Sequence, residues 1–336
     1  MSRAETEKQP GDVEMLGELA GACASIRSQL GRRIVGQENV IDQMLIALFT
    51  GGHSLLVGVP GLAKTLLVST MAEVLDLDFK RVQFTPDLMP ADILGTEVLV
   101  EDRSTGDRRF RFSPGPVFTN LLLADEINRT PPKTQAALLQ VMQEKAVSVG
   151  GVTHRLEEPY LVLATQNPIE QEGTYPLPEA ELDRFMLFID VGYPSGEQEV
   201  EIAMSTTGES LPAVEKVLGP ERIRDLQKLV RRVPVARPVA DYAVRLARAT
   251  RPGTAEATDL VNRYVSWGAG PRASQFLILA AKARAAFDGR FAANAQDVRE
   301  LALPVLRHRV IPNFQAEVAG IGVLDILSDV LDKTRP

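Results

Sequence analysis

Lys64 and Thr65 end a short loop whose residue types suit the binding of phosphate groups. The loop reads GVPGLAKT (58–65), follows the apolar run 54–57 and leads into a helical pattern over 66–75. A strand, a glycine-containing loop and a helix in this order form an anion cradle of backbone N–H groups at a helix N-terminus. Lys64 would contact the β- and γ-phosphates of a nucleotide, and the Thr65 hydroxyl would ligate Mg²⁺. The residues expected around the phosphates are Gly58, Pro60, Gly61, Leu62, Ala63, Lys64, Thr65 and Leu66.

One position of this loop departs from the usual pattern, which has glycine before the lysine. Here the residue is Ala63. Because the loop becomes helix at this point, a methyl group is tolerated if the φ of Ala63 is negative. A positive φ would make alanine costly.

Two neighbouring carboxylates, Asp125 and Glu126, follow the apolar run 121–124. Ligands of open α/β sheets bind at the carboxyl ends of the strands, so both side chains are expected beside the phosphate loop. Asp125 would contact Mg²⁺ through its water shell, and Glu126 would polarise the attacking water. Asn167 follows another such run, 161–164. Its amide would either align the water against the γ-phosphate or cap the turn that Asn-Pro forms.

The surrounding pattern predicts an α/β fold with a parallel sheet flanked by helices. Short apolar runs at 54–57, 80–84, 121–124, 161–164 and 186–191 alternate with helical patterns, which is typical of strands buried on both faces. From about residue 196 only helical spacing remains. We therefore divide the chain into an N-terminal tail and helix (1–33), an α/β core (34–195) and a small all-α lid domain (196–336).

Composition narrows the class of protein. The chain has 336 residues and a net charge of −7, which argues against general binding of nucleic acid. Cys23 is its single cysteine, so no intrachain disulfide forms. The polar N-terminus and the lack of any apolar run of about 18 residues predict neither a signal peptide nor a membrane span, and favour a cytoplasmic protein without membrane insertion.

These motifs resemble the AAA+ ATPase superfamily, and within it the MoxR family. The most specific stretches are IVGQ (34–37), GGHSLLVGVPGLAKT (51–65), ADEINRTPPKTQAALLQVMQE (124–144), ATQNP (164–168) and EGTYPLPEAELDRF (172–185). The resemblance implies that Val35 and Gly36 lie against the adenine, and that Lys64 with Thr65 and Asp125 with Glu126 are the Walker A and Walker B pairs. It further implies that Asn167 is sensor 1, Arg184 the arginine finger offered to a neighbouring subunit, and Arg272 sensor 2.

The family also implies how such a protein works. It implies an ATPase that uses ATP and Mg²⁺, assembles as a homo-oligomeric, hexameric ring and closes its lid through Arg272. Its function would be chaperone-like remodelling of a protein client, in the maturation of enzyme complexes, with a von Willebrand factor A domain protein as partner. A nucleic-acid motor or loader is the alternative, and the sequence does not discriminate ATP from GTP.

Two insertions match the family pattern as well. Residues 93–117 resemble the insert in helix 2, with strands around a turn at 105–107, and residues 146–157 resemble the hairpin before sensor 1. Such elements contact clients in related rings. An equally supported interpretation is that Phe110 and Phe112 pack the insert onto the core.

Overall fold

The computed structural model describes residues 11–101, 108–170, 172–206 and 212–336. The predicted turn at 105–107 lies outside these ranges. Among the described residues no helix is long and apolar enough to span a membrane.

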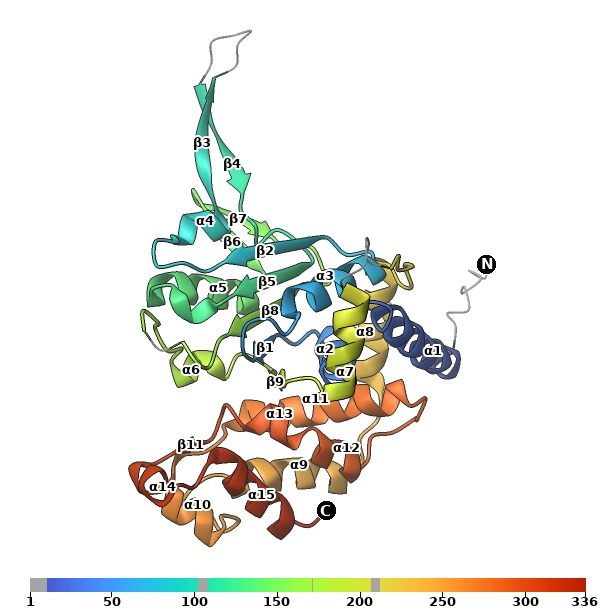
Figure 1. The fold of residues 1–336 in the computed structure, drawn as a ribbon, viewed down its shortest axis with the longest axis vertical. Coiled ribbons are helices and arrows are strands. Elements are labelled where there is room, and N and C mark those ends of the chain that lie inside the picture. Colours follow the sequence, from blue (N-terminus) through green and yellow to red (C-terminus); the bar gives the residue numbers. More distant parts are fainter. Residues whose placement is uncertain (1–10, 102–107, 171, 207–211) are drawn as a thin grey trace, which may run out of the picture.

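A five-stranded sheet forms the centre of the α/β core, as the sequence predicted (Figure 1). Every neighbouring pair is parallel. In spatial order the strands are β2 (Phe79–Gln83), β5 (Leu121–Asp125), β8 (Leu161–Gln166), β1 (Ser54–Val57) and β9 (Leu187–Asp190).

Alternate residues of the central strands enter two separate hydrophobic clusters. Leu121 and Leu123 of β5 pack with the helices α1 (Asp12–Leu30), α2 (Glu38–Thr50) and α3 (Lys64–Val74). Leu122 and Ala124 pack on the opposite face with α5 (Pro132–Glu144). Successive side chains of a strand point to opposite faces, so an entirely apolar run is expected wherever helices cover both.

The chain after residue 195 is mainly helical, and the predicted fold class is confirmed. One short two-stranded antiparallel ladder, β10 (Val265–Trp267) with β11 (Ile311–Pro312), lies among these helices. The helices are α7 (Gly196–Thr206), α8 (Pro220–Arg232), α9 (Arg237–Ala249), α10 (Asp259–Tyr264), α11 (Pro271–Phe287), α12 (Ala295–Glu300), α13 (Ala302–Leu306), α14 (Phe314–Ala319) and α15 (Val323–Lys333).

These later helices do not form an isolated unit. Leu226 and Leu277, from α8 and α11, share one continuous hydrophobic cluster with Leu45 of α2 and Leu19 of α1. All four side chains are fully buried. The position of the lid is therefore fixed against the core by apolar packing, and Figure 1 shows α11 running directly below the sheet.

Two β-hairpins occupy the predicted insertions. After α4 (Pro90–Leu94), β3 (Gly95–Glu101) pairs with β4 (Arg108–Pro114) and projects far from the lid (Figure 1). The second hairpin pairs β6 (Ala146–Val149) with β7 (Val152–Arg155) around two glycines of positive φ, as a tight hairpin turn requires.

The two aromatic residues of the first hairpin behave differently. Phe112 stacks on His154 of the second hairpin, with ring centroids 4.1 Å apart, so it does pack the insert onto the core. Phe110 is 70% exposed. Phe112 therefore packs as the second interpretation expects, whereas contact between the insert and a client stays a prediction.

Candidate nucleotide site

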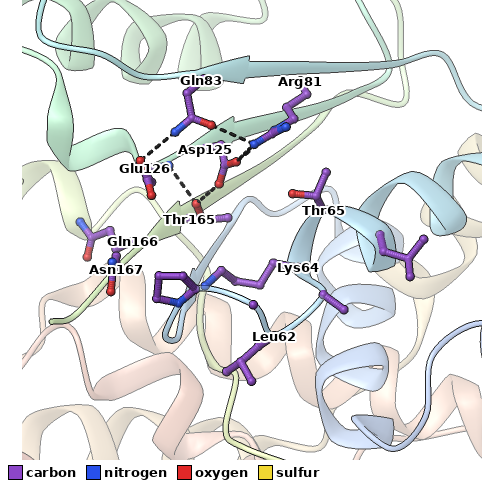
Figure 2. Close-up of a pocket in the computed structure, with 14 residues that line it drawn as sticks. Leu62, Lys64, Thr65, Arg81, Gln83, Asp125, Glu126, Thr165, Gln166 and Asn167 are labelled. Carbon is purple, nitrogen blue, oxygen red and sulfur yellow. Dashed lines mark hydrogen bonds and ion pairs between the residues drawn. The ribbon is translucent and has the colours of Figure 1, made fainter. Parts of the chain in front are cut away.

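A cavity of about 450 Å³ lies between the phosphate loop and the carboxyl ends of β2, β5 and β8 (Figure 2). It brings together side chains that are separated by up to a hundred residues in the sequence. Its lining residues are Pro60, Gly61, Leu62, Ala63, Lys64, Thr65, Leu66, Arg81, Gln83, Asp125, Glu126, Thr165, Gln166 and Asn167.

The Lys64 ammonium group lies inside the loop that precedes it. It donates hydrogen bonds to the carbonyl oxygens of Gly58 and Val59, the latter at 2.9 Å. Burial lowers the pKa of Lys64, and the negative charges of Asp125 and Glu126 oppose that effect. Gly58, the one predicted loop residue outside the cavity wall, thus contacts the site through its carbonyl group. A Cβ there would come within 2.5 Å of the Val191 carbonyl oxygen, which explains the need for glycine.

Ala63 has the positive φ that the sequence analysis named as the costly case for alanine. Its φ is 54° and its ψ 20°, the left-handed region, and it directly precedes the first residue of α3. For an L-residue other than glycine this conformation costs about 1–2 kcal/mol. The left-handed turn lies immediately before Lys64, the first residue of α3.

Asp125 is nearly buried and has two donors. Its Oδ1 accepts from the Thr165 hydroxyl at 2.6 Å, and its Oδ2 accepts from Nη2 of Arg81 at 2.6 Å. Because β5 and β8 are adjacent and parallel, the end of one strand supplies the hydroxyl that orients the carboxylate of the other. The carboxylate thereby faces the cavity in a fixed orientation.

Glu126 has an unusual backbone and a well-defined set of partners. Its φ is 56°, and its amide N–H donates to the Thr165 hydroxyl at 2.9 Å. Its Oε2 accepts from the Gln83 amide at 2.7 Å and from Arg129 at 3.2 Å. The left-handed backbone turns this side chain away from the strand direction and into the cavity wall, as Figure 2 shows.

Asn167 has the turn-capping role, one of the two that the sequence left open, and its amide nitrogen is free for the other. Its Oδ1 accepts from the Ile169 amide at 3.2 Å, so it caps the turn. Its Nδ2 is buried and has no hydrogen-bond partner among the described residues, although the side chain lines the cavity. A buried donor without a partner is costly, and a ligand oxygen in the cavity would satisfy it.

Gly36 lies beside α7, and neither Val35 nor Gly36 is part of the cavity wall. A Cβ on Gly36, whose φ is 67°, would meet the side chain of Gln198 at 2.6 Å. The next residue, Gln37, donates to the Leu62 carbonyl at 3.3 Å. The predicted adenine-side motif is thus tied to the phosphate loop by one hydrogen bond.

The two arginines predicted to act on phosphate lie elsewhere. Arg184 donates to the Leu139 carbonyl at 2.8 Å, and Arg272 donates to Asp183 at 3.0 Å. They share a smaller cavity of about 160 Å³ with Gly51 and Gly52, which precede β1. The phosphate loop follows β1, so the two arginines lie at the opposite end of that strand, roughly 13 Å away for four residues. Neither arginine lines its own chain's phosphate cavity, and closure of the lid through Arg272 stays a prediction.

Sequence reasoning missed Arg81, Gln83, Thr165 and Gln166. Arg81 and Gln83 alternate with the buried Val82 on β2, a strand at the edge of the sheet. Polar residues at alternate positions of an edge strand usually face solvent. The available signal was the neighbouring carboxyl end of β5, since parallel register places Gln83 opposite Asp125.

Comparison with known proteins identifies the family. Residues 53–187 match the model of the ATPase family associated with various cellular activities (AAA), and residues 257–329 match the AAA lid domain. The chain is 44% identical to "Chaperone MoxR1" of Mycobacterium tuberculosis over 325 residues, which cover 97% of this chain and 85% of that protein. The chain belongs to the MoxR family of AAA+ ATPases. Membership in this family implies nucleotide binding.

Other relatives agree with this MoxR assignment along the whole chain. "Protein MoxR" of Methylorubrum extorquens is 34% identical over 96% of this chain and 97% of its own length. A crystal structure of a candidate ATPase from Cytophaga hutchinsonii is 41% identical, superposes with a TM-score of 0.89 and covers 96% of this chain. This MoxR protein therefore shares both domains with its relatives.

Proposed function

We propose that this MoxR protein hydrolyses ATP in the cavity between the phosphate loop and β5. The observation that carries the proposal is that one cavity joins a cation, a hydroxyl, two carboxylates and an unpaired amide donor: Lys64, Thr65, Asp125, Glu126 and Asn167. Phosphoryl transfer needs little covalent help from the protein, and it depends on charge neutralisation and on an oriented water. Each of these requirements has a residue in the cavity wall.

Mg²⁺ fits the residues at this site. Thr65 and Asp125 both line the cavity, and a hydroxyl and a carboxylate are the hard oxygen ligands that Mg²⁺ takes while it retains several waters. When bound, the ion would supply positive charge that neutralises the phosphate groups. Glu126 would accept the proton of the attacking water, and Lys64 and Asn167 would hold the γ-phosphate oxygens. Val35 and Gly36 would lie against the base, whether adenine or guanine.

We further propose that Arg184 and Arg272 act on the nucleotide of a neighbouring subunit, within a ring. Two observations support this: both guanidinium groups share a cavity remote from their own phosphate loop, and Arg184 forms no ion pair with any described residue. A part-buried guanidinium without a carboxylate partner is suited to an incoming anion. Because the finger comes from a neighbour, the site of an isolated subunit would be incomplete. An arginine finger increases the rate of hydrolysis by about 10³–10⁵-fold, so an isolated subunit would be slower by that factor.

The proposed biological role is remodelling of a protein client. The relative named "Chaperone MoxR1" and the projecting β3–β4 hairpin support it. On this proposal a von Willebrand factor A domain protein is the partner and the maturation of enzyme complexes is the outcome. The assembly would be a hexamer.

The test of the ATPase proposal is the Glu126→Gln variant. It should bind ATP with the wild-type dissociation constant and hydrolyse it about 10²–10⁴-fold more slowly, the usual contribution of a general base. Turnover close to wild type would exclude Glu126 as the base. Affinity capture with this variant in ATP should also retain the client, which mass spectrometry would identify.

A further inference from the structure

Arg309 is the most deeply buried arginine among the ion pairs of the described residues. It binds the chain on both sides of Arg184. Its side chain is only 1% exposed. It follows α13 in the lid, yet its Nε donates to Asp183 Oδ1 at 2.8 Å. Its Nη2 donates to the carbonyl oxygens of Asp183 at 2.8 Å and Phe185 at 2.6 Å. One lid side chain thus binds the core backbone on both sides of Arg184.

The other end of the same guanidinium is also occupied. Nη1 contacts the carbonyl oxygen of Val305, the ring nitrogen Nε2 of His308 and, at 3.4 Å, the carbonyl oxygen of Met186. Burying a charge is expensive unless its donors are satisfied, and here each nitrogen of the fork has an acceptor. Burial lowers the pKa of Arg309 to about 10, so the group remains charged at neutral pH.

Asp183 connects this buried arginine to a second one. Its Oδ1 accepts from Arg309 and its Oδ2 accepts from Arg272 at 3.0 Å. The carboxylate therefore binds Arg272 directly. It also binds Arg309, which in turn holds the backbone on both sides of Arg184. Among the described residues, the Arg184 side chain has the Leu139 carbonyl as its one hydrogen-bond partner, so the position of its guanidinium depends on where its backbone is held.

We propose that Arg309 is a positioning residue for the arginine finger. Together with Asp183 it fixes residues 183–186, so that Arg184 and Arg272 are presented side by side to the nucleotide of the neighbouring subunit. The inference rests on the proposed function of Arg184 in the adjacent site. It adds that the lid acts on hydrolysis through the subunit that donates the finger, because Arg309 belongs to the lid and Arg184 to the core.

The test compares Arg309→Met with Arg184→Ala in assembled protein. Arg309→Met should lower kcat at least tenfold, towards the value of Arg184→Ala, and leave the dissociation constant for ATP within about threefold, since the phosphate cavity is untouched. The double variant should be no slower than Arg184→Ala alone, because both substitutions remove the same interaction, that of the finger with the neighbouring nucleotide. Independent, multiplicative losses or an unchanged kcat would overturn the proposal.

A mixing experiment separates positioning from general damage. Lys64→Ala subunits lack a working phosphate loop but keep an intact finger, so they should restore activity when mixed with Arg309→Met subunits. The control is Arg307→Gln, which removes a neighbouring arginine that pairs with Asp190 at 3.0 Å and stacks on Phe188. It should leave kcat and the mixing behaviour unchanged.

Two results distinguish this inference from the proposal it rests on. If Lys64→Ala subunits rescue Arg184→Ala and not Arg309→Met, the finger acts between subunits and Arg309 does not position it. If they rescue neither variant, the finger itself does not act between subunits. Should Arg309→Met fail to fold, Asp183→Asn applies the same criteria, since it keeps the carbonyl contacts of Arg309 and removes the negative charge that Arg309 and Arg272 share.

Discussion

The side-chain amide of Gln83 donates a 2.7 Å hydrogen bond to the Glu126 carboxylate. Two residues earlier on the same strand, Arg81 donates to Asp125. The parallel register of β2 and β5 explains both contacts, because it places Arg81 opposite Leu123 and Gln83 opposite Asp125. Two polar residues of an edge strand therefore bind both carboxylates of the site, and they restrict the movement of these carboxylates.

The first prediction concerns Gln83→Leu. A hydrogen bond to a charged group is worth about 1.5–3 kcal/mol, and at this part-exposed site we take the lower value. We expect Glu126 to give up this bond when it binds water, so removal of the bond should raise basal ATP turnover, by about tenfold at most. Steady-state hydrolysis and the ATP dissociation constant, which should not change, provide the measurement.

Gln140→Leu is the matched control for this substitution. Gln140 donates to Glu144 at 3.0 Å in the same kind of amide–carboxylate contact, on the exposed face of α5 and away from the cavity. It should leave turnover unaltered. A slower Gln83→Leu enzyme would mean that the amide orients Glu126 productively and does not restrain it.

The sequence predicted the parts of this site that are local, and it failed where the site depends on packing between distant elements. Lys64, Asp125 and Asn167 follow apolar strands, and parallel strands bring their carboxyl ends to one edge. Arg81 and Gln83 look like ordinary exposed residues of β2 until β5 lies beside them. The location of Arg272 depends on how α11 packs under the sheet, which no local pattern encodes.

The second prediction concerns Arg81 and the metal ion. Arg81 neutralises Asp125, with which Mg²⁺ would interact; the guanidinium is half exposed while the carboxylate is nearly buried, and we take about 1 kcal/mol for the contact. Arg81→Met should therefore lower the Mg²⁺ concentration that gives half-maximal turnover, by about fivefold at most. Removing Mg²⁺ with a chelator should abolish hydrolysis in both proteins.

Lys80→Met serves as the control for charge. Lys80 is an exposed cation of the same strand whose side chain points to the other face of the sheet. Its replacement changes the net charge by the same amount and should leave the Mg²⁺ requirement as it is. An increased Mg²⁺ requirement in Arg81→Met would show that Arg81 assists metal binding.

The third prediction tests the strain at Ala63. Glycine populates the left-handed region without the penalty that Ala63 incurs at a φ of 54°. Ala63→Gly should raise the free energy of unfolding by about 1 kcal/mol, which thermal or urea unfolding would measure. The same replacement inside α3, Ala72→Gly, should lower it by at least about 1 kcal/mol. A loss of stability in both variants would argue that Ala63 is unstrained.

The fourth prediction is a pH dependence of stability that comes from His53. The ring is buried: its Nε2–H donates to the Met142 carbonyl at 3.1 Å, and its Nδ1 accepts from the Val162 amide at 2.9 Å. Burial lowers the pKa of His53 from 6.5 to about 4, and the nearby Lys145 charge acts in the same direction. Between these two values the unfolded chain binds a proton that the native state excludes, so stability falls as the pH is lowered from about 6.5 towards 4.

The size of this effect follows from the same linkage. At pH 5.5 the contribution of His53 is a loss of about 1.4 kcal/mol relative to pH 7.5, where both states hold a neutral ring. His53→Asn keeps an acceptor for the Val162 amide and cannot be protonated. Between pH 7.5 and 5.5 the unfolding free energy of this variant should therefore fall by about 1.4 kcal/mol less than that of the wild type. Burial also lowers the pKa of His308, and that contribution is common to both proteins and cancels in the comparison. Equal pH dependence of the two proteins, measured by urea unfolding at pH 7.5 and 5.5, would mean that His53 gains its proton in the folded state.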